Sequence, residues 1–205
     1  MLALIDYDAG NVKSVEKALQ YLGEDAVLTS DKELILGADG VILPGVGAFG
    51  DAMERLHSRG LADVIYEVVK RKIPFLGICL GLQLLFESSE ETPGVKGLGI
   101  LKGKIVRFPD SEELKVPQIG WNDLQFPHKG RLFQDIAEGE YVYFVHSYYL
   151  KADNPDIVVA TTKYGVTVHA SVESGNVFAC QFHPEKSSKV GLAILKNFVD
   201  ITKEK

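Results

Sequence analysis

The sequence is poor in cysteine, in long apolar runs and in positive charge, and each shortage excludes a class of protein. Two cysteines cannot form a disulfide framework, and without a CxxC pair they indicate no structural zinc. The longest apolar run, residues 75–86, contains glycines and a glutamine and is shorter than the ~18 residues of a membrane span. The chain starts without a basic segment, so we expect no signal peptide. We expect a cytoplasmic protein, because free thiols suit a reducing compartment.

The charge and the composition of the chain exclude further classes of protein. Lys and Arg number 22 against 28 Asp and Glu, which gives a net charge of -6 and no electrostatic attraction to nucleic acid or anionic membranes. Hydrophobic residues make up 46% of the chain and charged residues 24%, an ordinary globular composition that excludes disordered and collagen-like proteins. A length of 205 residues suits one large domain, so we expect residues 1–205 to form a single domain.

Short apolar strands alternate with amphipathic helices in the first half of the chain. Apolar segments predict strands at 2–5, 25–28, 40–43 and 73–78. Helical spacing and capping residues predict helices at 12–22, 31–36, 48–57, 61–72 and from residue 80 onward. This alternation is typical of a parallel sheet that is covered by helices on both faces.

The second half of the chain differs, because strand-like segments follow one another directly. They lie at 100–108, 116–126, 140–151, 157–162, 166–173 and 176–182, with a closing helix near 191–199. Tyr164-Gly165 and Ser174-Gly175-Asn176 predict hairpin turns. We therefore predict an α/β fold: a mostly parallel central sheet flanked by helices, with additional antiparallel strands in the C-terminal half.

The segment Gly77-Ile78-Cys79-Leu80-Gly81 has the GxCxG pattern of a nucleophile elbow. In such an elbow, a sharp strand-to-helix turn strains the backbone of the nucleophile, and the two glycines relieve the crowding. The turn points the sulfur at the start of the helix, whose positive end stabilises a thiolate. The pattern by itself also fits a buried structural thiol, which is what most free cysteines are. Cys180 lies inside an alternating strand, and we expect it only to pack.

A cysteine nucleophile needs a histidine as its base, and the chain has five histidines. His183 is the best candidate, since it ends an apolar strand and is followed by Pro184 and Glu185. Pro184 stops the strand and holds Glu185 where its carboxylate can orient one ring nitrogen, which completes a nucleophile–base–orienter triad. His146 also ends an apolar strand and could reach the same edge of the sheet. The other three are expected to face solvent: His57, His128 and His169.

A glycine-rich turn at 45–50, Gly-Val-Gly-Ala-Phe-Gly, matches the GxGxxG pattern of dinucleotide sites. It follows the third strand rather than the first, and no acid stands at the end of the next strand to hold a ribose. Backbone N–H groups of Val46 and Gly47, together with that of Leu80, are better suited to form an oxyanion hole beside Cys79. A nucleotide-binding module is the alternative for this turn.

Three segments in this order and spacing, PGVGAFG, GICLGLQ and QFHPEKS, resemble the class I (triad) glutamine amidotransferases. Three further segments narrow the resemblance to the glutaminase subunits of imidazole glycerol phosphate synthase: DYDAGN at 6–11, VPQIGWN at 116–122 and VYFVHSYY at 142–149. The similarity covers essentially the whole chain. Gln118 departs from the histidine that is usual in those subunits.

The resemblance implies an activity and the residues that perform it. Cys79 would attack the carboxamide of glutamine, with His183 as base and Glu185 as orienter, and a cysteinyl thioester would release glutamate and ammonia. The positions that hold the substrate in the family match Gln83, Glu91, Ser147 and Tyr148. The positions at or near the partner interface match Asn11, Trp121, Asn122 and Lys186.

The resemblance also implies a heterodimer with a (β/α)8-barrel cyclase subunit that receives the ammonia for histidine biosynthesis, without a cofactor or a metal ion. In the family, the PGVG turn is often flipped at rest, so that no oxyanion hole is formed. Without the resemblance, Trp121 would be interpreted as a lone core aromatic. Two alternatives stay open: a glutaminase subunit for anthranilate, carbamoyl phosphate or pyridoxal phosphate synthesis, and a triad hydrolase that is not a glutaminase.

Overall fold

The structure, a computed structural model, describes residues 1–8, 10–110 and 114–204. Ala9, within the segment 6–11 used above, and Lys205, the last residue of the expected domain, lie outside the described residues. The strands of the central sheet are β1 (Leu2–Ile5), β2 (Ala26–Thr29), β3 (Gly40–Leu43), β4 (Phe75–Ile78), β10 (Val158–Tyr164), β11 (Val166–Ser174) and β12 (Val177–Cys180).

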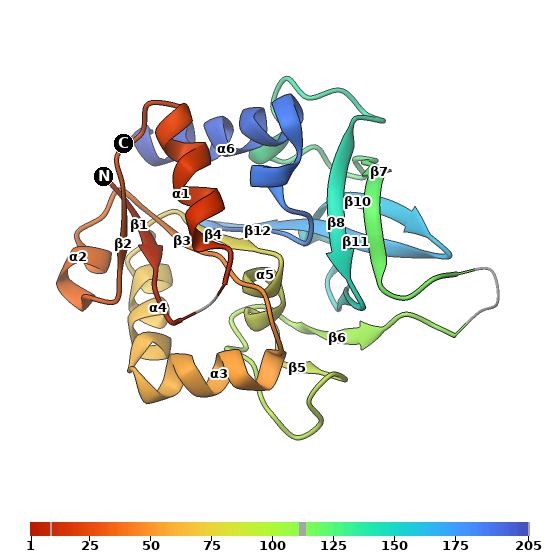
Figure 1. Ribbon diagram of the computed structural model, residues 1–205, viewed down its shortest axis with the longest axis horizontal. Helices are drawn as coiled ribbons and strands as arrows, with labels where there is room; N and C mark the ends of the chain where they lie inside the picture. The colour runs from red at the N-terminus through yellow and green to blue at the C-terminus, as the bar shows by residue number, and fades with distance from the viewer. Residues whose placement is uncertain (9, 111–113, 205) are drawn as a thin grey trace.

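In the described part of the chain these seven strands follow the order β10-β11-β12-β4-β3-β1-β2 (Figure 1). The five strands from β12 to β2 run parallel to one another. The strand β11 is antiparallel to both of its neighbours, β10 and β12, and the hairpin turns predicted at residues 164–165 and 174–176 connect them. The predicted architecture, parallel first and antiparallel toward the C-terminus, is confirmed.

Helices cover both faces of this sheet (Figure 1). They are α1 (Val12–Tyr21), α2 (Lys32–Leu36), α3 (Phe49–Ser58), α4 (Leu61–Lys70), α5 (Leu80–Leu84) and α6 (Ser188–Lys203). In β1, Ala3 and Ile5 pack with the helices α3 and α4, whereas Leu2 and Leu4 pack with α1 and α6. The strand is therefore apolar throughout, because successive side chains point into two different cores.

Two smaller sheets stand beside the central one, formed by β5-β6-β9 and by β7-β8. Their strands are β5 (Ser88–Ser89), β6 (Gly103–Arg107), β7 (Gln118–Asp123), β8 (Tyr141–His146) and β9 (Tyr148–Ala152). The prediction of one strand at 140–151 was wrong, because the chain leaves one sheet and enters the other at Ser147. Periodicity cannot show such a corner, since both strands are apolar and of strand-like composition. The 3-10 helices are η1 (Arg131–Phe133), η2 (Pro155–Ile157) and η3 (Pro184–Lys186).

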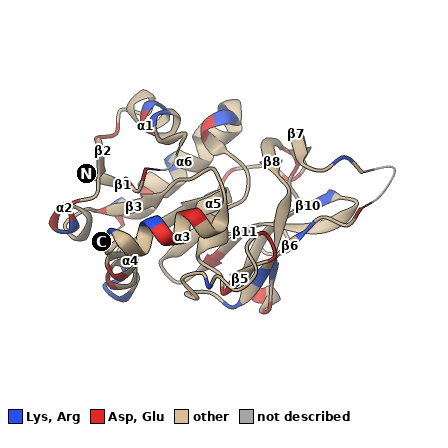
Figure 2. Cartoon of the chain, turned by 60° about the horizontal axis from the view of Figure 1, so that its bottom comes forward, with Lys and Arg blue, Asp and Glu red and all other residues tan. Residues whose placement is uncertain are grey.

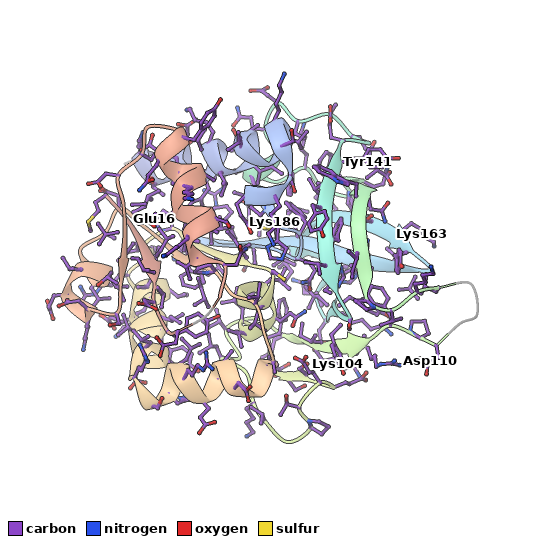
Figure 3. The ribbon with its side chains drawn as sticks, in the orientation of Figure 1. Glu16, Lys104, Asp110, Tyr141, Lys163 and Lys186 are labelled. Carbon is purple, nitrogen blue, oxygen red and sulfur yellow. The ribbon has the colours of Figure 1, made fainter. Side chains whose placement is uncertain are left out.

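Charged side chains are spread over the surface rather than segregated by sign. Acidic and basic residues both occur along α3 (Figure 2). The stick view places Tyr141 at the end of β8 and Lys186 between α1 and β8 (Figure 3). In the described part of the chain, no helix combines the length and the apolar character that crossing a membrane requires.

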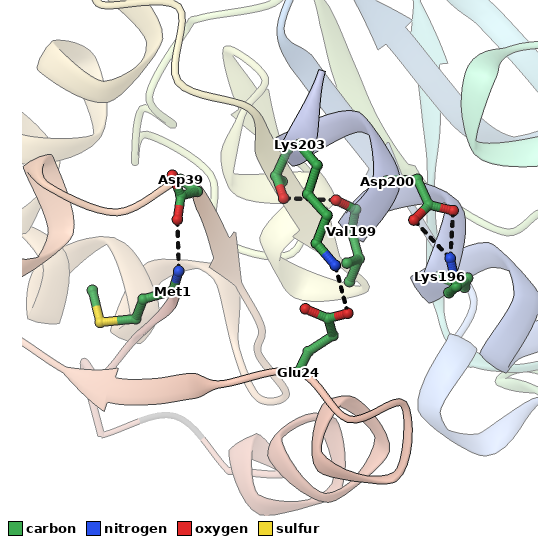
Figure 4. Close-up of polar contacts among 8 residues, drawn as sticks. Met1, Glu24, Asp39, Lys196, Val199, Asp200 and Lys203 are labelled. Atoms are coloured by element: carbon green, nitrogen blue, oxygen red, sulfur yellow. Dashed lines mark hydrogen bonds and ion pairs between the residues drawn. The ribbon is translucent and has the colours of Figure 1, made fainter. Parts of the chain in front are cut away.

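Ion pairs join segments that are distant in the chain, and one of them connects the last helix, α6, to the turn after α1 (Figure 4). The terminal amine of Met1 lies 2.6 Å from the carboxylate of Asp39, and Nζ of Lys203 lies 2.8 Å from Oε1 of Glu24. Because all four groups are at least partly exposed, solvent screening leaves each pair with little net effect on stability. Burial of the two apolar cores, not surface charge, holds the helices on the sheet.

Candidate active site

Cys79 occupies the sharp turn between β4 and α5, as the elbow pattern predicts. Its backbone angles, φ 55 and ψ -106, lie outside the regions that residues with a side chain ordinarily adopt. A Cβ atom at Gly77 would lie 2.7 Å from the carbonyl oxygen of Gly81, and one at Gly81 would collide with the carbonyl oxygen of Leu43. The two glycines are therefore required by close backbone packing around the elbow.

His183 lies beside Cys79 because β12 is the direct neighbour of β4 in the sheet. Cys180 at the end of β12 is paired with Ile78, and its carbonyl oxygen accepts the N–H of Cys79 at 2.8 Å. Both strands are parallel, so the residues that follow them emerge at the same edge of the sheet. The structure thus brings together two segments that are about one hundred residues apart in sequence.

His183 and Glu185 form a buried pair, with 2.8 Å between Nδ1 and Oε1. The other ring nitrogen, Nε2, is buried and has no hydrogen-bond partner within the described ranges, so it is the nitrogen left to serve the thiol. Burial lowers the pKa of His183, but interactions with Cys79 and Glu185 raise it more, to about 9. The ring is therefore protonated at neutral pH.

A cavity of about 250 Å³ opens over the sulfur. Its wall contains every residue that was predicted to hold the substrate or to form the oxyanion hole: Val46, Gly47, Leu80, Gln83, Glu91, Ser147 and Tyr148. The remaining lining residues are Cys79, Val145 and His146. The corner at Ser147 explains how the end of β8 and the start of β9 both reach this cavity.

One of the predicted oxyanion donors is engaged in this structure. The N–H of Leu80 donates to the carbonyl oxygen of Gly45 at 3.4 Å, so the carbonyl occupies the donor that an oxyanion would need. Gly45 cannot carry a side chain, because a Cβ would collide with the hydroxyl of Tyr7, which itself donates to the carbonyl of Pro44 at 3.0 Å. Gly47 has φ +119, a value that favours glycine.

The residues expected near the partner interface form two groups. Asn11 and Lys186 lie beside the triad: Nδ2 of Asn11 donates to Oε1 of Glu185 at 2.6 Å, and Lys186 is exposed. Trp121 and Asn122 lie on β7. Trp121 is 51% exposed, so its interpretation as a core aromatic is not supported, while the amide of Asn122 donates to the carbonyl of Lys163 at 2.9 Å.

The other cysteine and three other histidines have no place at this cavity. Cys180 is fully buried in β12, and burial raises the pKa of its thiol, as expected of a packing residue. His57 and His128 are exposed, as predicted. His169 does not simply face solvent, since it is half-buried and its Nδ1 accepts the N–H of Ala152 at 3.1 Å.

His146 is the site residue that the sequence only hinted at. It is buried in the cavity wall, and its Nδ1 lies 2.8 Å from the carbonyl oxygen of Tyr148. Because a carbonyl only accepts, Nδ1 carries the proton. Burial, together with nearby His183, lowers the pKa of His146 to about 4 against the opposing effect of this hydrogen bond. The ring is therefore neutral at pH 7.

We expect His146 to make folding sensitive to acid. The unfolded ring binds a proton near its ordinary pKa of about 6.5 and the folded ring only near 4, so stability falls as the pH falls from 6.5 to 4. The contribution is about 3 kcal/mol, and His146→Gln should remove this part of the loss while keeping a donor for Tyr148. Urea unfolding at pH 7 and pH 4 measures it; equal acid sensitivity in both proteins would contradict a buried neutral ring.

The fold and the site together are those of the class I glutamine amidotransferases. The sequence matches the family described as "Glutamine amidotransferase class-I" over residues 3–201, and the chain belongs to this family. It is 50% identical to "Imidazole glycerol phosphate synthase subunit HisH" of Moorella thermoacetica, over 98% of this chain and 95% of that protein. It is 48% identical to the protein of the same name from Methanocaldococcus jannaschii, over 98% and 100% of the two chains. These relatives confirm the narrower resemblance.

Solved structures support the fold independently. One described as "Crystal structure of glutamine amidotransferase" superimposes with a TM-score of 0.77 at 20% identity and covers 98% of each chain. PurLQS from Thermotoga maritima superimposes with a TM-score of 0.74 at 22% identity, over 98% of this chain and 97% of that one. At such low identity these likenesses concern the fold alone.

Proposed function

We propose that the chain acts as the glutaminase subunit of an imidazole glycerol phosphate synthase. It hydrolyses glutamine to glutamate and ammonia, and the ammonia passes to a cyclase subunit for use in histidine biosynthesis. The observation that carries this proposal is the cavity in which Cys79 lies beside the His183–Glu185 pair, in a chain that shares about half its residues with HisH subunits.

The first half of the reaction forms a covalent intermediate. The thiolate of Cys79 attacks the carbon of the glutamine carboxamide, and negative charge moves onto the amide oxygen. Protonated His183 then gives its Nε2 proton to the amide nitrogen, the C–N bond breaks, and ammonia leaves a glutamyl thioester. A pKa of about 9 keeps this proton on His183 at neutral pH, so it is available for the leaving group.

The second half of the reaction hydrolyses the thioester. Neutral His183 takes a proton from water while the water oxygen attacks the thioester carbon. The C–S bond then breaks, which restores the thiolate beside protonated His183, and the glutamic acid formed releases its proton to solvent. The carboxylate of Glu185 holds Nδ1 throughout, so that Nε2 faces the reacting atoms.

The oxyanion of each tetrahedral intermediate needs hydrogen-bond donors, for which we propose the N–H groups of Val46, Gly47 and Leu80. Since Leu80 donates to the carbonyl of Gly45 in this structure, the Gly45–Val46 peptide has to rotate before that N–H is free. A rotation at Gly45 meets no Cβ of its own. One missing oxyanion donor typically costs about 3 kcal/mol in the transition state, so the chain alone should be slow.

Four polar residues around the cavity are proposed to hold the substrate: Gln83, Glu91, Ser147 and Tyr148. One carboxylate oxygen of Glu91, Oε2, accepts the N–H of Phe49 at 2.8 Å. The other oxygen is left for the α-ammonium group of glutamine, which a carboxylate binds well. The side-chain NH2 group of Gln83 donates to the carbonyl oxygen of Tyr148 and to Oε1 of Gln181, so the side-chain oxygen of Gln83 is left for the substrate.

We propose that the partner, a (β/α)8-barrel cyclase, docks on the open face of the β7-β8 pair. Three large apolar side chains on this pair are exposed: Ile119 (62%), Trp121 (51%) and Tyr141 (57%). Val145, which is paired with Ile119, lines the cavity, so this face runs up to the active site. Ammonia in bulk water at neutral pH is protonated and loses its nucleophilic lone pair, so a partner seated here would receive it directly.

Trp121→Ala should weaken the complex without unfolding the chain. A half-exposed tryptophan at the centre of an apolar face is a typical hot spot, whose loss costs about 2 kcal/mol, or roughly 30-fold in Kd. Titration calorimetry with the cyclase measures the affinity, and glutamate release by the mixture with the cyclase's nucleotide measures activation. Tyr21→Ala, which removes an exposed aromatic at the far end of α1, is the matched control.

The result expected is slow glutamine hydrolysis by the chain alone, strong acceleration by the cyclase with its nucleotide, and loss of acceleration only in Trp121→Ala at limiting cyclase. Unfolding of Trp121→Ala would restore the interpretation of Trp121 as a core residue. Co-purification with a partner other than a cyclase barrel would instead favour another triad amidotransferase.

A further inference from the structure

Gln181 connects the Cys79 sulfur to the residue proposed to bind glutamine. It lies just after β12, is fully buried, and its backbone N–H donates to the carbonyl of Ala170 at 2.8 Å. Its side-chain Nε2 lies 3.6 Å from Sγ of Cys79, and its Oε1 accepts Nε2 of Gln83 at 3.0 Å. The residue belongs to the QFHPEKS segment, in which the mechanism above uses only the histidine and the glutamate.

The orientation of both amide groups follows from one carbonyl. The carbonyl oxygen of Tyr148 can only accept, so the atom of Gln83 that lies 3.2 Å from it is the NH2 group. That same NH2 group reaches Gln181, so the oxygen of Gln181 must face Gln83. The NH2 group of Gln181 is then turned toward Cys79, where it donates to the sulfur. Rotating either amide by 180° would place two acceptors or two donors against each other.

We infer that Gln181 is a positioning residue whose buried amide stabilises the thiolate of Cys79 and fixes the amide of Gln83. The inference rests on the proposed function, in which Cys79 is the nucleophile. A hydrogen bond to a charged acceptor is roughly twice as strong as one between neutral groups, so this N–H favours the thiolate over the thiol. Together with His183, it gives the sulfur a second buried polar neighbour at the base of the cavity.

The test removes the donor while keeping the volume of the side chain. Gln181→Met has a similar length and no hydrogen-bonding hydrogen, and Gln181→Leu repeats the test with a different shape. Ser171→Ala is the matched control, because the fully buried Ser171 hydroxyl donates to the Ala179 carbonyl at 2.7 Å, on the strand beside β12, without touching Cys79. The probe is iodoacetamide, with the alkylated cysteine located by mass spectrometry of proteolytic peptides.

The readout is the second-order alkylation rate of Cys79 as a function of pH. In both Gln181 variants we expect the pH of half-maximal rate to rise by about one unit, so that the rate well below this pH falls about tenfold. At high pH, where every thiol is ionised, the variants should react as fast as the wild type. A residue that only packs would lower stability, as in Ser171→Ala, and leave this profile in place.

An unchanged pH profile in folded Gln181→Met and Gln181→Leu overturns the inference. In the complex with the cyclase, kcat should fall about tenfold and KM for glutamine should rise, because Gln83 also loses its acceptor. The failure of the proposed function looks different: Cys79→Ala would then retain glutamine hydrolysis. Alkylation of Cys79 does not depend on that outcome, so the two failures are distinguishable.

Discussion

Cys79→Ala should abolish glutamine hydrolysis, with kcat lowered by at least about 10⁴-fold in the complex with the cyclase. Alanine fits the elbow without a larger side chain, but no atom remains to form the thioester. The measurement is glutamate released from glutamine, with the nucleotide of the cyclase present so that the wild type is fully active. Affinity for the cyclase should be unchanged, since Cys79 is buried at the cavity and is not among the exposed side chains of β7 and β8.

The second cysteine offers a matched control for this variant. Cys180 is fully buried, and its thiol lies 3.5 Å from the carbonyl oxygen of Phe182 rather than in the cavity wall. Cys180→Ala should keep kcat within about twofold and cost about 1 kcal/mol of stability, because it removes one buried sulfur. If Cys79→Ala keeps its activity while Cys180→Ala loses it, the nucleophile has been assigned to the wrong thiol.

Glu185→Ala should have the next largest effect, with kcat lowered by about 10³-fold or more. The carboxylate oxygen Oε1 accepts from His183 at 2.8 Å and from Asn11 at 2.6 Å. Its loss therefore frees both the His183 ring and the Asn11 side chain, which was predicted to lie near the partner interface. Without the acceptor at Nδ1, the neutral ring can carry its proton on Nε2 instead, and Nε2 then has no lone pair with which to act as a base. Steady-state kinetics of the complex, as a function of pH, measure the loss.

Glu185→Gln separates orientation from charge. A glutamine at this position can keep its oxygen toward His183 and Asn11, because Oε2 of Glu185 has no hydrogen-bond partner among the residues that the structure describes. The hydrogen bonds would survive and the negative charge would not, so the pKa of His183 should fall from about 9 toward its ordinary value. We expect a kcat between those of the wild type and Glu185→Ala, and equal losses in the two variants would show that charge alone matters.

Much of the candidate site could be predicted from local sequence, because its central parts are local structures. The elbow at Cys79 depends on glycines two residues away, and the orientation of His183 depends on the two residues after it. Family resemblance then supplied four residues expected to hold the substrate, and all four line the cavity. The proposed interface residues are less uniform, since Trp121 is exposed while Asn122 binds a backbone carbonyl of its own chain.

Local sequence was enough to predict the helix or strand type of the segments that build the central sheet and its covering helices, the strained turn at Cys79 and the pairing of His183 with Glu185. These depend on residues within a few positions of one another, whose propensities and backbone sterics act in any context. Only the tertiary structure decided that β12 lies beside β4, that the chain turns a corner at Ser147, and that Gln181 faces the sulfur. Such contacts join segments far apart in the chain, and burial, sheet order and hydrogen-bond satisfaction select them together rather than any local pattern.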